Sequence, residues 1–366
     1  MVALLFICFL ASAVVTLLLV RKTGAHARIY GEALPQRFHA GHIPRIGGIG
    51  IVVGCFAGWT AATIAPVSYF NVYFSWNLPL ALAASLAPAV LVGVYEDITQ
   101  RVPVRYRLLL TLVSAGLACA ALDLKVTRLD LPWVDSMLAM MPWASTALAL
   151  FAIGGLPHAF NIIDGYNGLC ATVALLICLA IGHVALQLGD RQLAALALCV
   201  AGATVGFLVW NYPRGLIFAG DGGAYFWGGS IAVISILLVQ RHPIVSPWFP
   251  MLLLVYPVFE TFFSIYRKLA RGHSPGLADA LHFHQLIYRR IVRAVVNDDA
   301  SRRMLVRNNR TSPYLWSFTL LTVVPAMIFW RNTGILMLLC LLFVVTYIAA
   351  YLTIVRFKVP KWLRGR

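Results

Sequence analysis

Charged side chains are scarce in this sequence. Asp, Glu, Lys and Arg make up 11% of its 366 residues, and only 13 residues are acidic. A soluble domain is usually about 25% charged and roughly 45–50% apolar, whereas 61% of this chain is hydrophobic. An ordinary soluble domain and a disordered chain are therefore both excluded.

Paired cysteines are also lacking. The seven cysteines lie in apolar stretches and form no C-x-x-C pair. Buried cysteine usually behaves as a small hydrophobic residue, so this pattern excludes a disulfide-stapled module and gives no zinc framework. The chain also lacks a clear internal repeat, so an inverted-repeat transporter gains no support.

Long apolar runs make up most of the sequence. A membrane-spanning helix needs about 20 mostly apolar residues, and this rule predicts an all-α polytopic membrane protein with about 11 (10–11) transmembrane helices in a single domain, 1–366. The first run has no basic segment before it and Arg21-Lys22 directly after it, which favours a retained span over a secretory signal. The expected spans are 2–20, 46–65, 78–94, 104–122, 143–160, 169–188, 192–210, 222–240, 247–266, 313–330 and 332–355.

The basic residues are distributed unevenly between the loops. Of the 29 lysines and arginines, 24 lie in or beside the loops after odd-numbered spans and in the C-terminal tail. Because basic loops stay in the cytoplasm, we expect these loops and the C-terminus to be cytoplasmic, the N-terminus to be outside, and the protein to be multi-pass in the inner (plasma) membrane. The net charge of +16 then needs no nucleic-acid partner. The cytoplasmic loops are about 21–45, 95–103, 161–168, 211–221 and 267–312.

Four polar clusters fall on these cytoplasmic loops. Each also has an ordinary explanation, namely a solvated helix end, a turn, a helix N-cap or loop polarity. Their coincidence on one side of the membrane favours a functional site. The alternate spacing of the two histidines suits one face of a strand, and no third zinc ligand is near them. The clusters are Glu96-Asp97, the segment from His158 through Asn161, Asp164 and Asn167 to Gly168, Asp221 within Gly-Asp-Gly-Gly, and His282-Phe283-His284-Gln285.

The chemistry of these residues indicates phosphoryl transfer. Carboxylate and amide oxygens suit Mg²⁺, with Mn²⁺ as the alternative, and such a metal binds through one or two carboxylates together with substrate phosphates. Glycine-rich helix starts and basic residues suit phosphate oxygens. The residues thus predict a metal-dependent enzyme that acts on a phosphorylated lipid at the surface of the lipid bilayer.

In this order, the motifs resemble those of the polyprenyl-phosphate N-acetylhexosamine-1-phosphate transferases (glycosyltransferase family 4). His39-x4-Pro44-x2-Gly47-Gly48 is similar to the family's H-x4-P-x2-G-G. The segment 161–169 is similar to N-x-x-D-G-x-D-G-L, and the segment 220–223 to G-D-x-G. The H-x-H form of the histidine cluster favours the branch that initiates lipid-linked O-antigen or polysaccharide over the MurNAc-pentapeptide translocase. The sequence does not fit the pattern of the CDP-alcohol phosphotransferases, because Asp164-Gly165 is not followed by Ala-Arg and the later spaced Asp pair is missing.

The sequence departs from the family at three positions. Glu96 replaces the first Asp of an Asp-Asp pair, Asn167 replaces an acidic residue, and Gln285 replaces the last histidine. Glutamate offers the same oxygen chemistry, and glutamine still forms hydrogen bonds but carries no charge. Asn167 is a candidate for altered nucleotide-sugar preference.

The resemblance implies transfer of a sugar-1-phosphate from a UDP-sugar to polyprenyl (undecaprenyl) phosphate, with release of UMP. GlcNAc is the default sugar and a homodimer is left open. Asp221 is expected to bind Mg²⁺, Asp97 to orient or deprotonate the acceptor, and Glu96 to assist near the metal. The expected substrate-binding residues are His39, Asn161, Asp164, Asn167, His282, His284 and Arg289.

Two alternatives remain at this point, a transporter or flippase and an inactive scaffold. Transporters place ionisable groups in mid-span, whereas these carboxylates mostly lie at helix ends. Glu260 is the exception, because it lies about seven residues, roughly 10 Å of helix rise, inside its span from Arg267. It is either a carboxylate hydrogen-bonded within the bundle or a site residue.

Overall fold

The computed structural model describes residues 1–22, 43–70, 72, 77–272, 274, 281–292 and 299–356, and these residues form helices and connecting segments without a strand. The predicted all-α class is therefore confirmed. The helices are α1 (Val2–Lys22), α2 (Gly48–Ile64), α3 (Val67–Phe70), α4 (Asn77–Thr99), α5 (Val104–Leu122), α6 (Pro132–Met140), α7 (Pro142–Ile163), α8 (Leu169–Gln187), α9 (Arg191–Asn211), α10 (Gly220–Arg241), α11 (Trp248–Leu269), α12 (Phe283–Leu286), the π-helical turn η2 (Ile287–Ile291), α13 (Ala300–Phe329) and α14 (Thr333–Val355).

Ten described helices are long and apolar enough to cross a membrane, judged by length and composition. Each coincides with one of the eleven expected spans. The remaining expected span, 46–65, is the apolar helix α2 of 17 residues, which is at the lower end of the usual length range of about 17–25 residues. The protein is thus an all-α polytopic membrane protein.

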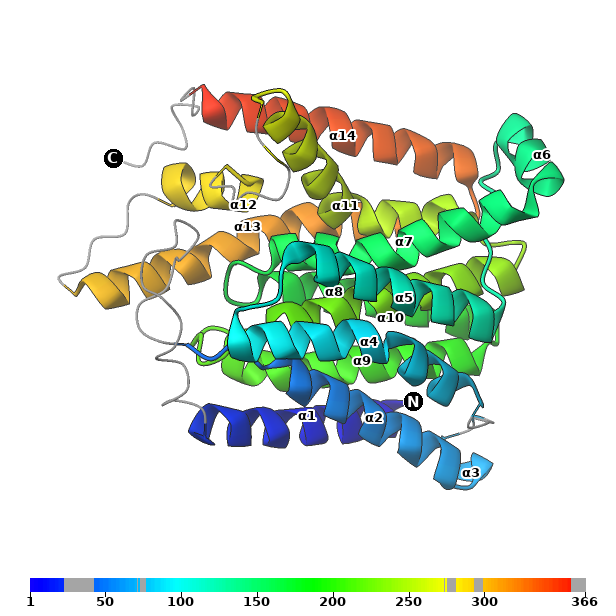
Figure 1. Ribbon diagram of the computed structural model, residues 1–366, viewed down its shortest axis with the longest axis horizontal. Coiled ribbons are helices and arrows are strands. Elements are labelled where there is room, and N and C mark those ends of the chain that lie inside the picture. Colours follow the sequence, from blue (N-terminus) through cyan, green and yellow to red (C-terminus); the bar gives the residue numbers. More distant parts are fainter. Residues whose placement is uncertain are drawn as a thin grey trace.

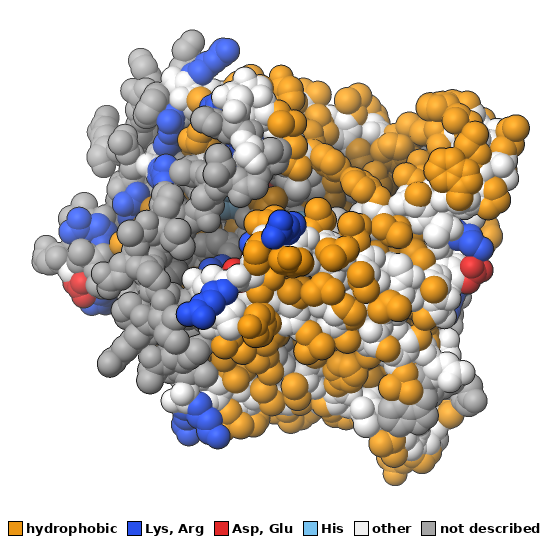
Figure 2. All heavy atoms as spheres, viewed as in Figure 1, with side chains coloured by type: hydrophobic (Ala, Val, Ile, Leu, Met, Phe, Trp, Pro, Cys, Tyr) orange, Lys and Arg blue, Asp and Glu red, His pale blue; other side chains and the backbone are white. Residues whose placement is uncertain are grey.

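The long helices run between two ends of the molecule. Figure 1 shows the last residues of α1 and α14 at one end, together with α12, and shows α6 at the opposite end. We call the first of these the site end. In Figure 2, lysine and arginine side chains gather mainly at the site end, and hydrophobic side chains cover most of the surface between the two ends. This distribution is the one that a bilayer around the middle of the helices requires.

Helix α10 occupies the centre of the bundle and is buried along almost its whole length. It packs against α2, α4 and α7. The packing against α4 is close, because a Cβ atom added at Gly93 would lie 2.6 Å from the backbone nitrogen of Gly222 and 2.8 Å from the carbonyl carbon of Asp221. Glycine at position 93 therefore lets the start of α10 approach α4.

Three features differ from the sequence-based expectation. The short helix α6, which carries the exposed Trp133, was not predicted. Helix α13 begins at Ala300, well before the expected span at 313. The segment after His282 is helical (α12 and η2), so the expected strand-like spacing of the two histidines was wrong. His39 lies outside the described residues.

Substituting Gly93 by alanine is expected to destabilise the fold by about 1–3 kcal/mol, because the added methyl group would push α4 away from α10. Thermal unfolding of the detergent-solubilised protein measures this effect. Gly116→Ala in α5 is the matched control, since a Cβ atom there would meet nothing within 4 Å. Equal stability of the two variants would contradict this account of the packing.

Candidate active site

The predicted polar clusters meet at the site end, around a cavity of about 1250 Å³. They come from the end of α4, the end of α7, the start of α10 and the segment that contains α12. The glycine-rich and polar residues at these helix ends therefore lie close together in the structure. Seven of the expected site residues line the cavity, namely Glu96, Asp97, Asn161, Asp164, Asp221, His282 and His284.

Asp97, in the last turns of α4, binds the start of α10. Its Oδ1 accepts a hydrogen bond from the backbone N–H of Asp221 at 2.8 Å, and its Oδ2 accepts one from Gly222 at 2.9 Å. The first N–H groups of a helix have no partner within the helix and form the positive end of its dipole. Although only 2% exposed, the Asp97 side chain therefore has two backbone donors, and it fixes the position of Asp221.

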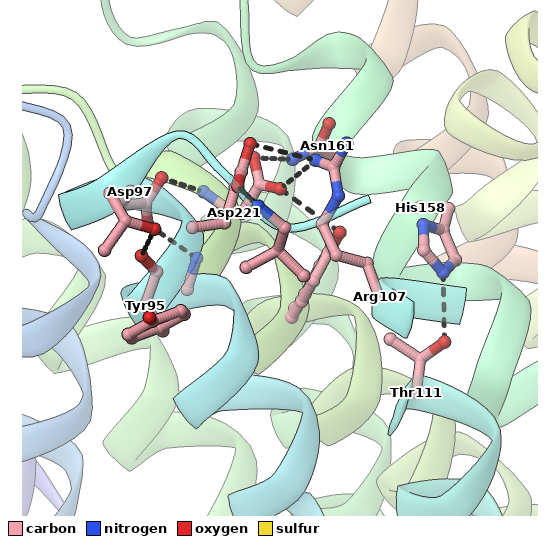
Figure 3. Close-up of polar contacts among 12 residues, drawn as sticks. Tyr95, Asp97, Arg107, Thr111, His158, Asn161 and Asp221 are labelled. Carbon is pink, nitrogen blue, oxygen red and sulfur yellow. Dashed lines mark hydrogen bonds and ion pairs between the residues drawn. The ribbon is translucent and has the colours of Figure 1, made fainter. Parts of the chain in front are cut away.

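Asp221 is held by side chains from two further helices. Its Oδ2 accepts from Arg107 Nη1 of α5 at 2.6 Å, and its Oδ1 accepts from Asn161 Nδ2 of α7 at 2.6 Å. Tyr225, one turn further along α10, donates to Oδ2 at 3.2 Å. Figure 3 shows Arg107 and Asn161 pointing toward Asp221 from the side opposite Asp97. Helices α5 and α7 thus meet the Asp221 carboxylate, and α4 holds the backbone of the same residue.

Arg107 is a site residue that the sequence did not identify. In the sequence it was only one of the basic residues counted beside the cytoplasmic loops. In the structure its Nη1 binds Asp221 and lies 3.9 Å from Glu96 Oε1. The other oxygen of Glu96 accepts from the backbone N–H of Val102 at 2.7 Å. An arginine in the first turn of an apolar helix was the available signal, because such a residue needs a partner.

His158, which begins one of the predicted polar clusters but was given no role there, lies one turn before Asn161 in α7 and lines the cavity. Its Nε2 is 3.0 Å from Thr111 Oγ1 of α5 (Figure 3). Its ring also meets the edge of Tyr225, with a centroid separation of 5.3 Å. The polar part of the site therefore continues one helical turn beyond Asp221.

Asp164 follows the last residue of α7 and is the C-cap of that helix. Burial raises the pKa of its carboxyl group from the ordinary 3.8 to about 7, and the nearby charge of Asp221 adds to the rise. Arg45 and the backbone N–H of Gly220 act in the opposite direction. The Asp164 carboxyl thus changes charge near neutral pH.

Asn167 holds the loop between α7 and α8 against α13. Its backbone N–H donates to Asn308 Oδ1 at 2.8 Å, and its Nδ2 donates to Asn309 Oδ1 at 2.8 Å. Ser312 Oγ donates to its carbonyl oxygen at 2.6 Å. Among the residues that the structure describes, Asn167 and the expected substrate ligand Arg289 are outside the set that lines the cavity.

The two histidines lie together at the cavity wall. Their rings are nearly parallel, 10° apart, with centroids separated by 5.3 Å. His282 Nδ1 is 3.0 Å from Glu260 Oε1, and the edge of Tyr166 meets His284 at 5.4 Å. The structure therefore links Glu260, left open by the sequence, to the histidine cluster.

The donor atoms suit a divalent cation only if substrate completes its coordination. Within the described ranges, no group of three or more His, Cys, Asp or Glu side chains could hold a metal. Asp221 and Glu96 offer carboxylate oxygens, and both already lie close to the cation of Arg107. One or two carboxylates plus substrate phosphates are the usual Mg²⁺ set, so these residues fit a metal that arrives with a phosphorylated substrate.

An apolar groove continues from the polar site along the helices. Its lining includes Leu108 of α5, Phe151 of α7 and Phe262 of α11, and these three side chains are also exposed on the surface of the bundle. The groove reaches Lys125 and Gln240 toward the opposite end. An exposed apolar channel of this length is suited to a lipid chain.

The fold and the site together define a polytopic membrane protein in which a carboxylate-rich polar site opens into an apolar groove.

The model for glycosyl transferase family 4 matches residues 79–239. Over 280 residues the chain is 26% identical to a probable undecaprenyl-phosphate N-acetylglucosaminyl 1-phosphate transferase of Bacillus subtilis (strain 168), covering 76% of this chain and 75% of that protein. It is 27% identical over 278 residues to the undecaprenyl-phosphate alpha-N-acetylglucosaminyl 1-phosphate transferase of Escherichia coli (strain K12), covering 74% and 71%. A phospho-N-acetylmuramoyl-pentapeptide-transferase of Synechococcus sp. (strain JA-2-3B'a(2-13)) is 36% identical over 111 residues, 30% of this chain and 31% of that protein.

The resemblance drawn from the motifs is therefore confirmed: residues 79–239 match glycosyl transferase family 4, and the relatives similar over about three quarters of the chain are polyprenyl-phosphate N-acetylhexosamine-1-phosphate transferases.

The raised pKa of Asp164 predicts a pH-dependent loss of stability. The folded protein holds this proton more tightly than the unfolded chain, so stability falls as the pH rises from about 4 to about 7 and is constant above that range. Asp164→Asn cannot ionise and escapes this loss. The unfolding temperature of the variant should therefore rise relative to the wild type between about pH 5 and pH 8 in metal-free detergent.

Asp123→Asn is the control for this comparison, because the Asp123 side chain is 78% exposed. Its unfolding temperature should follow that of the wild type at every pH. Parallel pH profiles for Asp164→Asn and the wild type would contradict the raised pKa.

Proposed function

We propose that the chain transfers a sugar-1-phosphate from a UDP-sugar to undecaprenyl phosphate, forming the polyprenyl-diphosphate sugar and releasing UMP. The observation that carries this proposal is the cluster around Asp221 at the mouth of an apolar groove. Such a site can hold a soluble phosphorylated donor and a lipid phosphate side by side. The names of two similar relatives support undecaprenyl phosphate as acceptor and GlcNAc as the default sugar.

The acceptor fits the apolar groove. Its polyprenyl chain would lie along the exposed side chains of Leu108, Phe151 and Phe262, where it would contact apolar groups. Its phosphate would then lie beside Arg107 and His158 at the mouth of the groove. By the distribution of basic residues, this mouth faces the cytoplasm of a cell whose inner membrane contains the protein.

The donor diphosphate needs charge neutralisation. Asp221 is the residue that we expect to hold Mg²⁺, with Glu96 and the Asn161 side chain as further oxygen donors close by. When bound, the metal would neutralise the diphosphate. Arg107, which binds Asp221 directly, is placed to move onto a phosphate oxygen. Asn161, Asp164 and the two histidines supply the remaining polar contacts for nucleotide and sugar.

The reaction is a substitution at the β-phosphorus of the donor. An oxygen of the lipid phosphate forms a bond to this phosphorus, and the bond from the β-phosphorus to the bridging oxygen breaks, so that the electron pair leaves with UMP. The second pKa of a phosphate monoester is about 6, so the acceptor is largely dianionic at neutral pH and no proton has to be removed from it.

Asp97 is best assigned a positioning role. We had expected it to orient or deprotonate the acceptor, but both of its oxygens accept backbone N–H groups of α10. Both oxygens are thus engaged by the backbone of α10, and a proton taken up by either oxygen would compete with one of these hydrogen bonds. We therefore propose that Asp97 acts by holding Asp221 at the cavity wall.

The test is UMP release by the purified protein with Mg²⁺, undecaprenyl phosphate and a panel of UDP-sugars. We expect UMP from at least one N-acetylhexosamine donor, and only when the lipid phosphate is present. Folded protein that releases no UMP from any donor would contradict the proposal and favour an inactive scaffold or a transporter.

Asp221→Asn is the matched variant in this assay. It keeps the size of the side chain but removes the charge, so we expect turnover to be abolished while membrane insertion is normal. Full activity of this variant would contradict the assignment of the metal to Asp221.

A further inference from the structure

Glu260 is a carboxylate with no solvent exposure, in α11, a helix long and apolar enough to cross the membrane. A carboxylate in such a place is costly unless other groups compensate its charge and its hydrogen-bonding capacity. Three donors do so. Oε1 accepts from His282 Nδ1 at 3.0 Å and from the backbone N–H of Phe283 at 3.1 Å, and Oε2 accepts from the Tyr347 hydroxyl at 2.6 Å.

These contacts anchor the start of the histidine segment. His282 is the N-cap of α12, and Phe283 is the first residue of that helix. Glu260 therefore holds the side chain of one residue and the backbone of the next. His284, stacked on His282, takes its position from the same anchor, and both histidines line the cavity.

The hydrogen-bond pattern also fixes which nitrogen of His282 carries a proton. Oε1 accepts a backbone N–H, so it is an acceptor, and His282 Nδ1 must donate to it. Nε2 is the ring nitrogen that remains. In a neutral ring Nε2 would be an acceptor and would repel a phosphate oxygen, whereas in an imidazolium it is a second donor. The Glu260 carboxylate, 3.0 Å from Nδ1, is the anionic partner that such an imidazolium would need.

Several other charged or titratable side chains surround the pair Glu260 and His282. Among the described residues that interact with this pair, Glu260 is the only carboxylate. The surrounding side chains are His284, stacked on His282, Tyr256 and Arg267 of α11, and Tyr347 and Tyr351 of α14. The anionic partner that can balance a charged His282 is therefore Glu260.

We propose that Glu260 is a positioning residue that holds His282 as an imidazolium, with Nδ1–H on the Glu260 carboxylate and Nε2–H available to a phosphate oxygen of the donor diphosphate. This inference rests on the proposed function, because it takes the donor to be a nucleoside-diphosphate sugar. It gives a carboxylate that does not belong to the Asp221 cluster a part in donor binding, and Glu260 acts there through His282.

The experiment compares the binding of UDP and of uridine by calorimetry, in detergent with Mg²⁺, to the wild type, Glu260→Gln and Tyr347→Phe. Glutamine can still accept the hydrogen bonds of His282 and Phe283 but has no charge. We expect Glu260→Gln to bind UDP about tenfold more weakly, the size of a lost charge-assisted hydrogen bond, and uridine as the wild type does. The KM for the UDP-sugar should rise by a similar factor, with little change in kcat.

Tyr347→Phe is the matched control. It removes the third hydrogen bond to the same carboxylate and keeps the aromatic ring that packs against Phe259 and Phe283. UDP affinity of this variant should stay within about twofold of the wild type, since the charge beside His282 is unchanged. Equal losses of UDP and uridine binding in both variants would mean that Glu260 only supports the fold, and would overturn the proposal.

A double-mutant comparison shows whether Glu260 acts through His282. His282→Gln should weaken UDP binding but not uridine binding, and Glu260→Gln should add nothing to it. Additive losses would overturn the proposal. Unchanged UDP affinity in His282→Gln would also overturn it, and this outcome can be measured even if Glu260→Gln fails to fold.

The wild type separates this inference from the proposed function. If it binds UDP in the expected pattern but releases no UMP from any UDP-sugar, the transferase proposal fails while the role of Glu260 stands. If it transfers sugar-1-phosphate but Glu260→Gln matches it in UDP affinity, only the role of Glu260 fails. A wild type that does not bind UDP overturns both.

Discussion

Two backbone N–H groups at the start of α10 donate to one carboxylate, that of Asp97. The start of a helix buried between other helices needs an acceptor for these groups, and here the acceptor comes from α4 rather than from α10 itself. The same bonds place Asp221 at the cavity wall, where Arg107 and Asn161 reach it. The close approach at Gly93 makes this geometry feasible. The site therefore depends on a structural contact as much as on its own polar groups.

The second constraint is that a charged side chain buried in so apolar a protein needs partners that compensate its charge. The carboxylate of Glu260 is fully buried and is compensated by His282, Phe283 and Tyr347, and that of Asp97 by the α10 terminus. In both cases a buried carboxylate orders a polar segment at the rim of the cavity. The apolar groove begins where these polar groups end, so the transfer reaction that we propose would take place at the boundary between two solvents, with a lipid on one side and a nucleotide on the other.

The sequence predicted the parts of the structure that follow from local composition. Apolar runs such as 104–122 and 192–210 predicted their helices closely, because about 20 consecutive apolar residues suit few other structures. Helix α6 was missed because it is only nine residues long, and α12 because two histidines with one residue between them indicate no helix. Contacts between distant residues were beyond reach. Asn167 binds Asn309, 142 residues away, so its structural role could not be predicted from the sequence. Arg107 is identified as a site residue only by its contact with Asp221. The motifs identified which residues gather, but not which of them hold one another in place.

The most direct test of the account is a crystal structure of the protein with UMP and Mn²⁺, in which anomalous scattering locates the metal. We expect the anomalous peak at the carboxylate of Asp221, with Asp97 still accepting the N–H groups of Asp221 and Gly222. A peak at Asp97, with the start of α10 released from that carboxylate, would contradict the account.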